Sequence, residues 1–170
     1  MVRPYDSERE WAMSEKAAAL AERFTQLNDD LIATVERCSD AQWAAKCADT
    51  GWSVAVQAHH IAGGEASIVG VVNAIANGQQ PPPVTMAQVD AGNAKHAERY
   101  ANVSKEETAN LLRENGAMVA KSIRGMSDEQ LARTGEFLAG NRASVEQLVQ
   151  FLSIGELERH GEHLHQAVAG

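Results

Sequence analysis

The chain has 170 residues, enough for one domain over residues 1–170 that buries about two thirds of its unfolded surface. Its net charge of −8 and isoelectric point near 5.2 argue against binding to nucleic acid, which requires a basic face. Two cysteines are too few for a disulfide framework, and we find neither an export signal nor an apolar run long enough to span a membrane. We therefore expect a cytoplasmic protein that binds neither nucleic acid nor membranes.

The first long segment predicts a helix. Ala-rich stretches with few β-branched runs favour helices over strands throughout the chain. This helix is expected to begin with Asp6 or Ser7 as N-cap and to end near Cys38, because its apolar residues recur at spacings of three and four. A short helical turn over residues 39–43 follows, and it opens with a capping-box pattern.

The second helix is the most apolar segment of the chain. After a loop over residues 46–52, Ser53 is the expected N-cap. The helix should run to about Asn77, where Gly78 supplies a C-terminal stop.

A proline-rich stretch then separates the two halves. Residues 79–83 cannot lie inside a helix and predict a stiff crossover connection. A third helix is expected from about Met86, and a capping box at Ser104 and Glu107 predicts either a kink or a fresh start before the helical pattern continues to Gly125.

The last part of the chain repeats this plan. A short helical turn over residues 127–132 precedes an expected loop that contains Gly135 and Gly140. Ser144 and Gln147 then have the capping-box spacing that opens a fourth helix, which should run nearly to the end.

The two halves resemble each other weakly. Residues 38–44 (Cys-Ser-Asp-Ala-Gln-Trp-Ala) match residues 126–132 (Met-Ser-Asp-Glu-Gln-Leu-Ala), and each segment is followed by a loop and a Ser-Val helix start. We predict an all-α fold, a four-helix bundle with a long crossover connection between helices 2 and 3. The second and fourth helices then hold matching places in the two halves.

Both of these helices carry histidines. Glu156, His160 and His163 are spaced i, i+4 and i+7 and share one edge of the fourth helix, while His59 and His60 lie on the second. Imidazole and carboxylate groups at this spacing are ligands for zinc and similar divalent ions. Two or three ligands from the fourth helix and one from the second would leave an open coordination position, which is typical of a catalytic metal. A solvated helix with scattered histidines would show the same spacing.

Short motifs in this sequence resemble a known family. Gly51-Trp52-Ser53 followed by His60-Ile61-Ala62 resembles the second-helix motif of the DinB/YfiT-like superfamily, and Glu156-x-x-x-His160-x-x-His163-Leu164 resembles its mycothiol-dependent maleylpyruvate isomerase branch. Val89-Asp90-Ala-Gly-Asn93-Ala94 is similar to the third helix of that branch. The resemblance implies a four-helix bundle with a divalent metal between helices 2 and 4.

The resemblance also implies a ligand set. His60 is the ligand from the second helix, and Glu156 and His160 are the ligands from the fourth. His163 departs from the family pattern and is a fourth ligand, a replacement for Glu156, or a group next to the ligands. His59 points about 100° away from His60 and is expected not to bind the metal.

We expect an enzyme that uses Zn²⁺, with Ni²⁺ as the second choice. The resemblance implies a transferase or isomerase that joins a low-molecular-weight thiol, of the mycothiol or bacillithiol type, to a small electrophile. His163 would be its catalytic proton-transfer group. The alternatives are a metal-dependent hydrolase and a non-catalytic, stress-related bundle that binds metal or ligand. A homodimer is compatible with the resemblance and with the apolar second helix.

Other conspicuous residues have structural interpretations. Trp11 and Trp43 are expected to pack between helices, and Trp52 to anchor the start of the second helix or to lie at a pocket mouth. The two cysteines are expected to be buried small residues, and His96 to lie on a solvated face.

Overall fold

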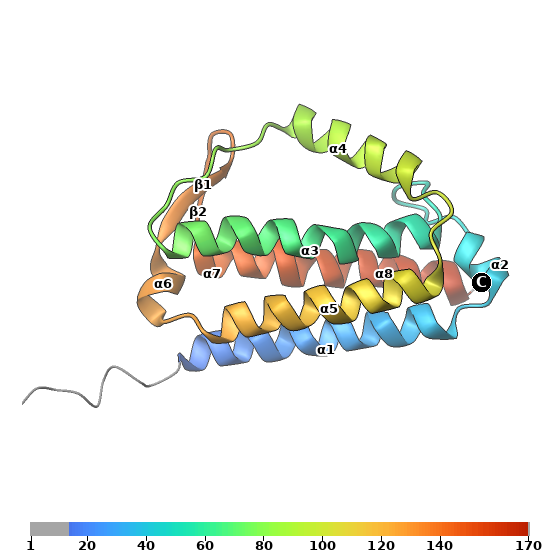
Figure 1. The fold of residues 1–170 in the computed structure, drawn as a ribbon, viewed down its shortest axis with the longest axis horizontal. Coiled ribbons are helices and arrows are strands. Elements are labelled where there is room, and N and C mark those ends of the chain that lie inside the picture. Colours follow the sequence, from blue (N-terminus) through green and yellow to red (C-terminus); the bar gives the residue numbers. More distant parts are fainter. Residues whose placement is uncertain (1–13, 170) are drawn as a thin grey trace, which may run out of the picture.

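The computed structural model describes residues 14–169, and this part of the chain is mostly helical (Figure 1). The elements, in chain order, are α1 (Glu15–Arg37), α2 (Asp40–Ala44), α3 (Val54–Ala76), α4 (Met86–Arg99), α5 (Lys105–Arg124), α6 (Asp128–Ala132), β1 (Thr134–Leu138), β2 (Asn141–Ser144), α7 (Val145–Leu148), the π-helical segment η1 (Val149–Ile154) and α8 (Gly155–Ala169).

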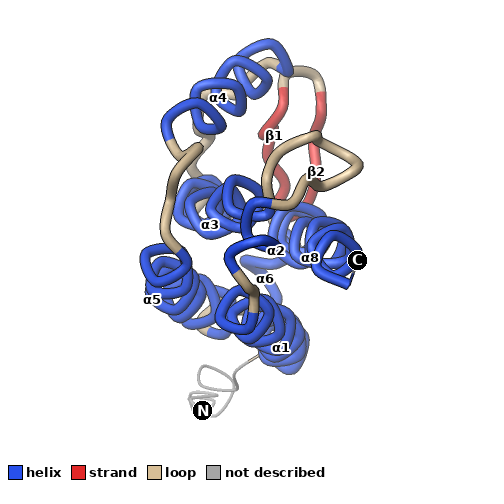
Figure 2. Tube along the Cα trace, turned by 90° about the vertical axis from the view of Figure 1, so that its right-hand side faces the viewer, coloured by secondary structure: helices blue, strands red, loops and turns tan. Residues whose placement is uncertain are grey.

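Four long helical segments form the body of the molecule. They are α1, α3, α5 and the unbroken run α7–η1–α8. Helix α1 packs against α5 and α8, and α3 packs against the same two helices, so α1 and α3 lie diagonally across the bundle (Figure 2). Helices α3 and α8, which carry the predicted ligands, are therefore direct neighbours.

Two of the three predicted capping boxes are confirmed. Side chain and backbone exchange hydrogen bonds in the pairs Ser39–Gln42 and Ser144–Gln147, and a further box that was not predicted forms at Ser127–Gln130. At the third predicted box the Ser104 side chain accepts a hydrogen bond from the Glu107 amide, without a return bond from the Glu107 side chain within residues 14–169. Ser53 caps α3, as predicted, by accepting a hydrogen bond from the Val56 amide. The predicted N-caps Asp6 and Ser7, like Trp11, lie outside the described residues, and within them Ser14 caps α1.

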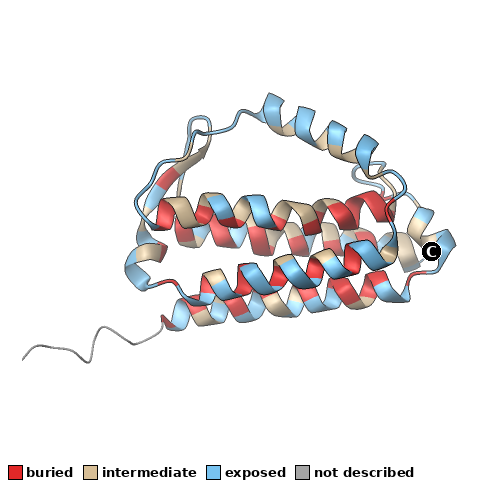
Figure 3. Cartoon of the chain, viewed as in Figure 1, coloured by how far each residue is buried: buried red, intermediate tan, exposed pale blue. Residues whose placement is uncertain are grey.

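The connection from α3 to α5 contains the proline-rich stretch and α4. The capping residue Ser104 marks a fresh helix start, because α4 ends at Arg99 and α5 begins at Lys105. Helix α4 has no buried residue and lies along the outside of the bundle (Figure 3). The stretch before it is fixed at Val84, whose carbonyl accepts a hydrogen bond from the Ala139 amide at 2.9 Å.

The expected glycine loop is a β-hairpin, which corrects the all-α prediction. Strands β1 and β2 pair antiparallel, with Gly135 opposite Ala143. Gly140 has a φ of +81° at the turn, a backbone conformation that glycine adopts without strain. Gly135 packs against Ile75 so closely that a Cβ would come within 2.7 Å of its side chain. These glycines thus permit a tight turn and a close contact rather than an irregular loop.

The predicted fourth helix is continuous, but its middle is π-helical. Residues Val149–Ile154 form η1, and the Gly155 amide donates to the Gln150 carbonyl five residues earlier. Such segments occur often at functional sites. This one leads directly into the turn of α8 that carries Glu156 and His160.

Small and polar residues set the contact between α1 and α5. Asn28 is 5% exposed, and its amide donates to the Leu112 carbonyl at 3.1 Å. Gly116 faces this side chain, and a Cβ on Gly116 would lie 2.1 Å from Asn28 Nδ2. The glycine thus allows α5 to approach the buried amide.

The remaining structural predictions can be checked directly. Cys38 and Cys47 are free and buried, as expected. Trp43 packs partly buried against the core, and its indole N–H donates to the Val103 carbonyl at 3.0 Å. Within residues 14–169, every helix is too short or too polar to cross a membrane.

Replacing Gly116 with alanine is expected to destabilise the fold. The new methyl group must displace the Asn28 amide and break its hydrogen bond, so the free energy of unfolding should fall by about 1–3 kcal/mol despite alanine's better helix propensity. Urea unfolding followed by circular dichroism measures the change. Gly92→Ala on α4, where a Cβ meets no atom within 4 Å, is the control and should stabilise by up to about 1 kcal/mol. Equal effects of the two substitutions would contradict the steric argument.

Candidate metal centre

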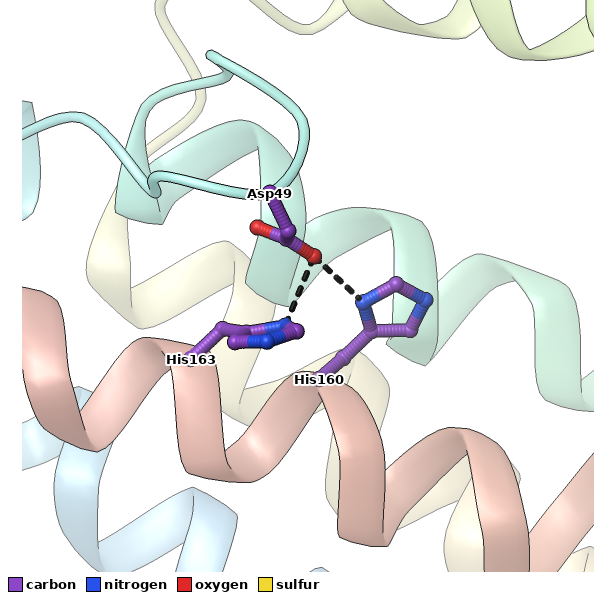
Figure 4. A group of neighbouring side chains, drawn as sticks. All are labelled: Asp49, His160 and His163. Carbon is purple, nitrogen blue, oxygen red and sulfur yellow. Dashed lines mark ion pairs between the residues drawn. The ribbon is translucent and has the colours of Figure 1, made fainter.

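The candidate site lies between α3 and α8 and is closed by the loop over residues 45–53. This loop is held at both ends, because the Cys47 amide donates to the Trp52 carbonyl at 2.8 Å and the Val54 amide to the Ala45 carbonyl at 2.9 Å. Gly51 allows the chain to turn inside the loop with a φ of +70°. The loop therefore holds Asp49 in a fixed place over α8 (Figure 4).

Asp49, His160 and His163 form a metal-capable cluster. Oδ2 of Asp49 lies 2.7 Å from Nδ1 of His163 and 3.4 Å from Nδ1 of His160. Each residue offers one ligand atom, and these atoms all lie within 4.8 Å of one another (Figure 4). The sequence predicted the two histidines of this cluster and missed Asp49, which no local pattern singles out.

The other ring nitrogen of His160 faces a different carboxylate. Nε2 of His160 lies 3.1 Å from Oε2 of Glu156, as the i, i+4 spacing predicted. Arg159 also forms a close ion pair with Glu156, and its guanidinium nitrogen lies 3.5 Å from the same His160 Nε2. A positive charge therefore lies beside the Nε2 side of His160.

His60 approaches the same group from α3. Its ring packs edge-on against His160, with the ring centroids 6.3 Å apart, and against Trp52 at 5.3 Å. Trp52 lies at the start of α3 and also lines a cavity of about 570 Å³, so both expectations for it are met. The predicted ligands His60, Glu156 and His163 thus gather around His160, with Glu156 at its Nε2 and the Asp49 partner of His163 near its Nδ1.

The polar surroundings of His160 include a second residue that the sequence did not indicate. Gln57 is fully buried, and its amide is in close contact with Nδ1 of His160. Thr50, from the loop, donates to the other end of this amide at 2.9 Å. Gln57 and Thr50 therefore fix the orientation of the His160 ring.

The protonation states of His60 and Glu156 suit metal binding. Burial lowers the pKa of His60, and the nearby His160 lowers it further. Burial by itself would raise the pKa of Glu156, but the hydrogen bond from His160 and the charge of Arg159 outweigh it, and the pKa lies below its usual range. A neutral imidazole and an ionised carboxylate are the forms that bind metal.

The donor set around His160 fits a divalent ion. Nδ1 of His163 is buried and has no hydrogen-bond partner among the described residues 14–169, although Asp49 Oδ2 lies 2.7 Å away. A buried imidazole nitrogen without a hydrogen bond, beside a carboxylate, is a donor pair that a metal ion would satisfy. Two imidazoles and one carboxylate also leave positions for an exogenous ligand on an ion of coordination number four or more.

A buried acid lies next to this group on α3. Glu65 is 4% exposed, and neither of its carboxyl oxygens has a hydrogen-bond partner in the part of the chain that the structure describes. It lines a cavity of about 30 Å³ together with His60, Ser153 and Glu156. Burial raises the pKa of Glu65 to about 8, so this carboxyl is mainly protonated at neutral pH.

His96 is half-buried against other rings, which corrects the expectation that it lies on a solvated face. Its ring lies among those of His59 at 5.1 Å, His60 at 5.2 Å and Tyr100 at 4.7 Å, measured between centroids. Burial, together with the charges that His60 and His59 could carry, lowers the pKa of His96 to about 4. Helix α4 thus carries a neutral histidine inward onto α3.

The fold and the site define a helical bundle with histidines and carboxylates gathered between two neighbouring helices. Residues 23–164 match the sequence profile of the DinB superfamily, and the chain belongs to that superfamily. No curated protein sequence matches it significantly.

Two solved structures share the fold. YfiT from Bacillus subtilis, described as a probable metal-dependent hydrolase with an unusual four-helix bundle topology, superposes with a TM-score of 0.71 at 15% identity, over 92% of this chain and 89% of YfiT. The mycothiol-dependent maleylpyruvate isomerase superposes with a TM-score of 0.70 at 14% identity, over 88% of this chain and 60% of the isomerase. At these identities the likeness concerns the fold.

Substituting Glu65 should reveal its neutral state. The unfolded chain releases this proton above its ordinary pKa of 4.5, whereas the folded chain holds it to about pH 8, so wild-type stability falls as the pH rises between these values. Glu65→Gln removes this dependence. In metal-free protein the variant should gain stability over wild type from about pH 5 to about pH 8, by up to a few kcal/mol, and no more above that range.

Urea unfolding at several pH values measures this difference. Glu98→Gln, at an exposed position on α4, is the matched control and should show no such trend. A stability difference between Glu65→Gln and wild type that does not change with pH would contradict a raised pKa.

Proposed function

We propose that this protein is a metal-dependent enzyme that transfers or isomerises small electrophiles with the help of a low-molecular-weight thiol. The observation that carries the proposal is the cluster of Asp49, His160 and His163, whose ligand atoms lie within 4.8 Å of one another beside His60 and Glu156. Membership of the DinB superfamily and the fold shared with a mycothiol-dependent isomerase support the thiol as cosubstrate.

His160 is the central ligand in this proposal. Its Nδ1 side offers Asp49 and His163, and its Nε2 side offers Glu156, while the His60 ring lies 6.3 Å from the His160 ring between centroids. The Arg159 guanidinium opposes a cation on the Nε2 side, so the distances favour the Asp49–His160–His163 set. The family resemblance favours His60, Glu156 and His160, which requires Arg159 to turn away. Zn²⁺ is the expected ion and Ni²⁺ the second choice.

A bound divalent ion would lower the pKa of a thiol or water in its open position and so supply the nucleophile. Side chains of the protein would then accept and return the proton that the thiol or water releases. If the ion uses the Nε2 side of His160, His163 with its Asp49 partner is free to accept and return that proton, and Asp49 stabilises the imidazolium. If the ion uses the Nδ1 side, His163 is a ligand. The carboxylate left to exchange the proton is then Glu156, which lies beside Nε2 of His160.

Hydrolysis is the second candidate function. YfiT, whose chain is matched over 89% of its length, is described as a probable metal-dependent hydrolase. The same site would then activate water instead of a thiol. A bundle that binds metal without turnover is the remaining alternative.

Metal content separates the two ligand sets. In purified, tag-free protein, His160→Ala should lower the bound divalent metal by about one ion per chain, because both sets share this histidine. Asp49→Asn should have the same effect if the Nδ1 set binds the ion, and His60→Ala if the Nε2 set does. Elemental analysis gives the content, and His165→Ala on the same helix is the control. Unchanged metal in His160→Ala would refute the site.

Thiol dependence tests the reaction class. Zinc-loaded protein should accelerate consumption of a small electrophile in the presence of mycothiol or bacillithiol, and His160→Ala should lose at least about 100-fold of that rate. Turnover of an ester or amide without added thiol would favour the hydrolase instead. Metal binding with neither activity would favour the non-catalytic bundle.

A further inference from the structure

A second group of histidines lies on the other side of α3, away from α8. His59 on α3 and His96 on α4 meet at the edge of a cavity of about 550 Å³ whose other walls come from α5. Nδ1 of His59 lies 3.3 Å from Nε2 of His96. We propose that these two nitrogens form a second divalent metal site, of the kind that binds Zn²⁺ or Ni²⁺, separate from the centre around His160.

The distance between the two nitrogens suits a shared ion. Zinc binds imidazole nitrogen at about 2.0–2.1 Å, and a tetrahedral angle at the ion then places two such nitrogens about 3.3–3.4 Å apart. A direct hydrogen bond to nitrogen is usually shorter, with donor and acceptor about 2.9–3.0 Å apart. The observed 3.3 Å therefore matches two ligands of one ion better than a donor and its acceptor.

Both imidazoles are held in place before any ion binds. His59 is 4% exposed and stacks on Tyr100 with the ring centroids 3.8 Å apart. His96 lies over Gly63, where a Cβ would come 3.8 Å from its Cε1 atom. Because both donor rings are already fixed by the fold, metal binding costs less side-chain conformational entropy than it would with mobile histidines.

Carboxylates are available to complete the coordination. Glu107 and Glu114 on α5 line the same cavity, both are exposed, and neither forms an ion pair within residues 14–169. Their oxygens are not yet within ligand distance, so a rotation of one exposed side chain must bring it to the ion. Water would fill any remaining position, as is common for ions bound by two or three protein groups.

The position of this site implies a role for α4. That helix has no buried residue of its own, and His96 and Tyr100 are its contacts with the His59 ring. An ion bound by His59 and His96 would therefore tie α4 to α3. The centroid of the His96 ring is also 5.2 Å from that of His60. The bound ion would therefore hold α4 beside the centre around His160.

Zinc titration of the metal-stripped full chain tests the proposal by calorimetry. Wild type should bind about two zinc ions per chain, and His96→Phe, which keeps a ring against Tyr100, should lose one of them or weaken it at least about tenfold. His160→Ala should lose the other ion and keep the His59–His96 one. His165→Phe is the matched control and should bind both.

These variants keep the two proposals apart. If only the centre around His160 fails, wild type and His160→Ala will each bind one ion, and His96→Phe will bind none. If His96→Phe takes up zinc as wild type does, the second site is refuted. Anomalous scattering at the zinc edge from zinc-soaked wild-type crystals needs no variant. A peak about 2.0–2.1 Å from both His59 Nδ1 and His96 Nε2 supports the site, and its absence at zinc saturation refutes it.

Discussion

The packing of α3 directly against α8 is the constraint on which the rest of this molecule depends. Because α1 and α3 lie diagonally across the bundle, the second and last long helices of the chain become neighbours. His60 can then face His160 across a single helix–helix contact. The loop that carries the chain from α1 to α3 must pass over the end of this contact, and it brings Asp49 with it. The contact between α3 and α8 thus brings together His60, His160 and Asp49, which come from three parts of the sequence.

The His160 ring is the point where two electrostatic environments meet. Within residues 14–169, its Nδ1 side holds a carboxylate with no Lys or Arg partner, while its Nε2 side holds a carboxylate already paired with Arg159. A neutral imidazole carries one N–H, so only one of its two ring nitrogens at a time has a free lone pair that can bind a metal ion. Buried Gln57 contacts Nδ1 and therefore influences which tautomer is present. The choice of ligand set is thus coupled to a hydrogen bond from α3.

Local signals explain what the sequence could predict. Capping boxes such as Ser144–Gln147 involve residues three apart, and the i, i+4 relation of Glu156 to His160 requires only that the segment be helical. The hairpin has no such local signal, because glycines in sequence indicate only a loop, whereas the contact of Gly135 with Ile75 depends on the tertiary fold.

The same limit applies to the two sites. Asp49 and Gln57 reach His160 through the way in which the loop and α3 pack, which no spacing reveals. His96 lies between charged and small residues in the sequence, and only the path of α4 turns it toward His59.

The π-helical segment η1 makes the orientation of α8 depend on the helix type of the six residues before it. A π-helical stretch accommodates one more residue than the α-helix that would span the same distance. If these six residues, Val149–Ile154, formed ordinary α-helix with none removed, everything after them would turn by about 100°. His160 and His163 would then leave the face that meets α3 and the loop, while the helix itself stayed intact. The π-helical stretch therefore absorbs one residue of the chain and keeps both histidines on that face, and the centre depends on this local helix geometry although the bundle does not.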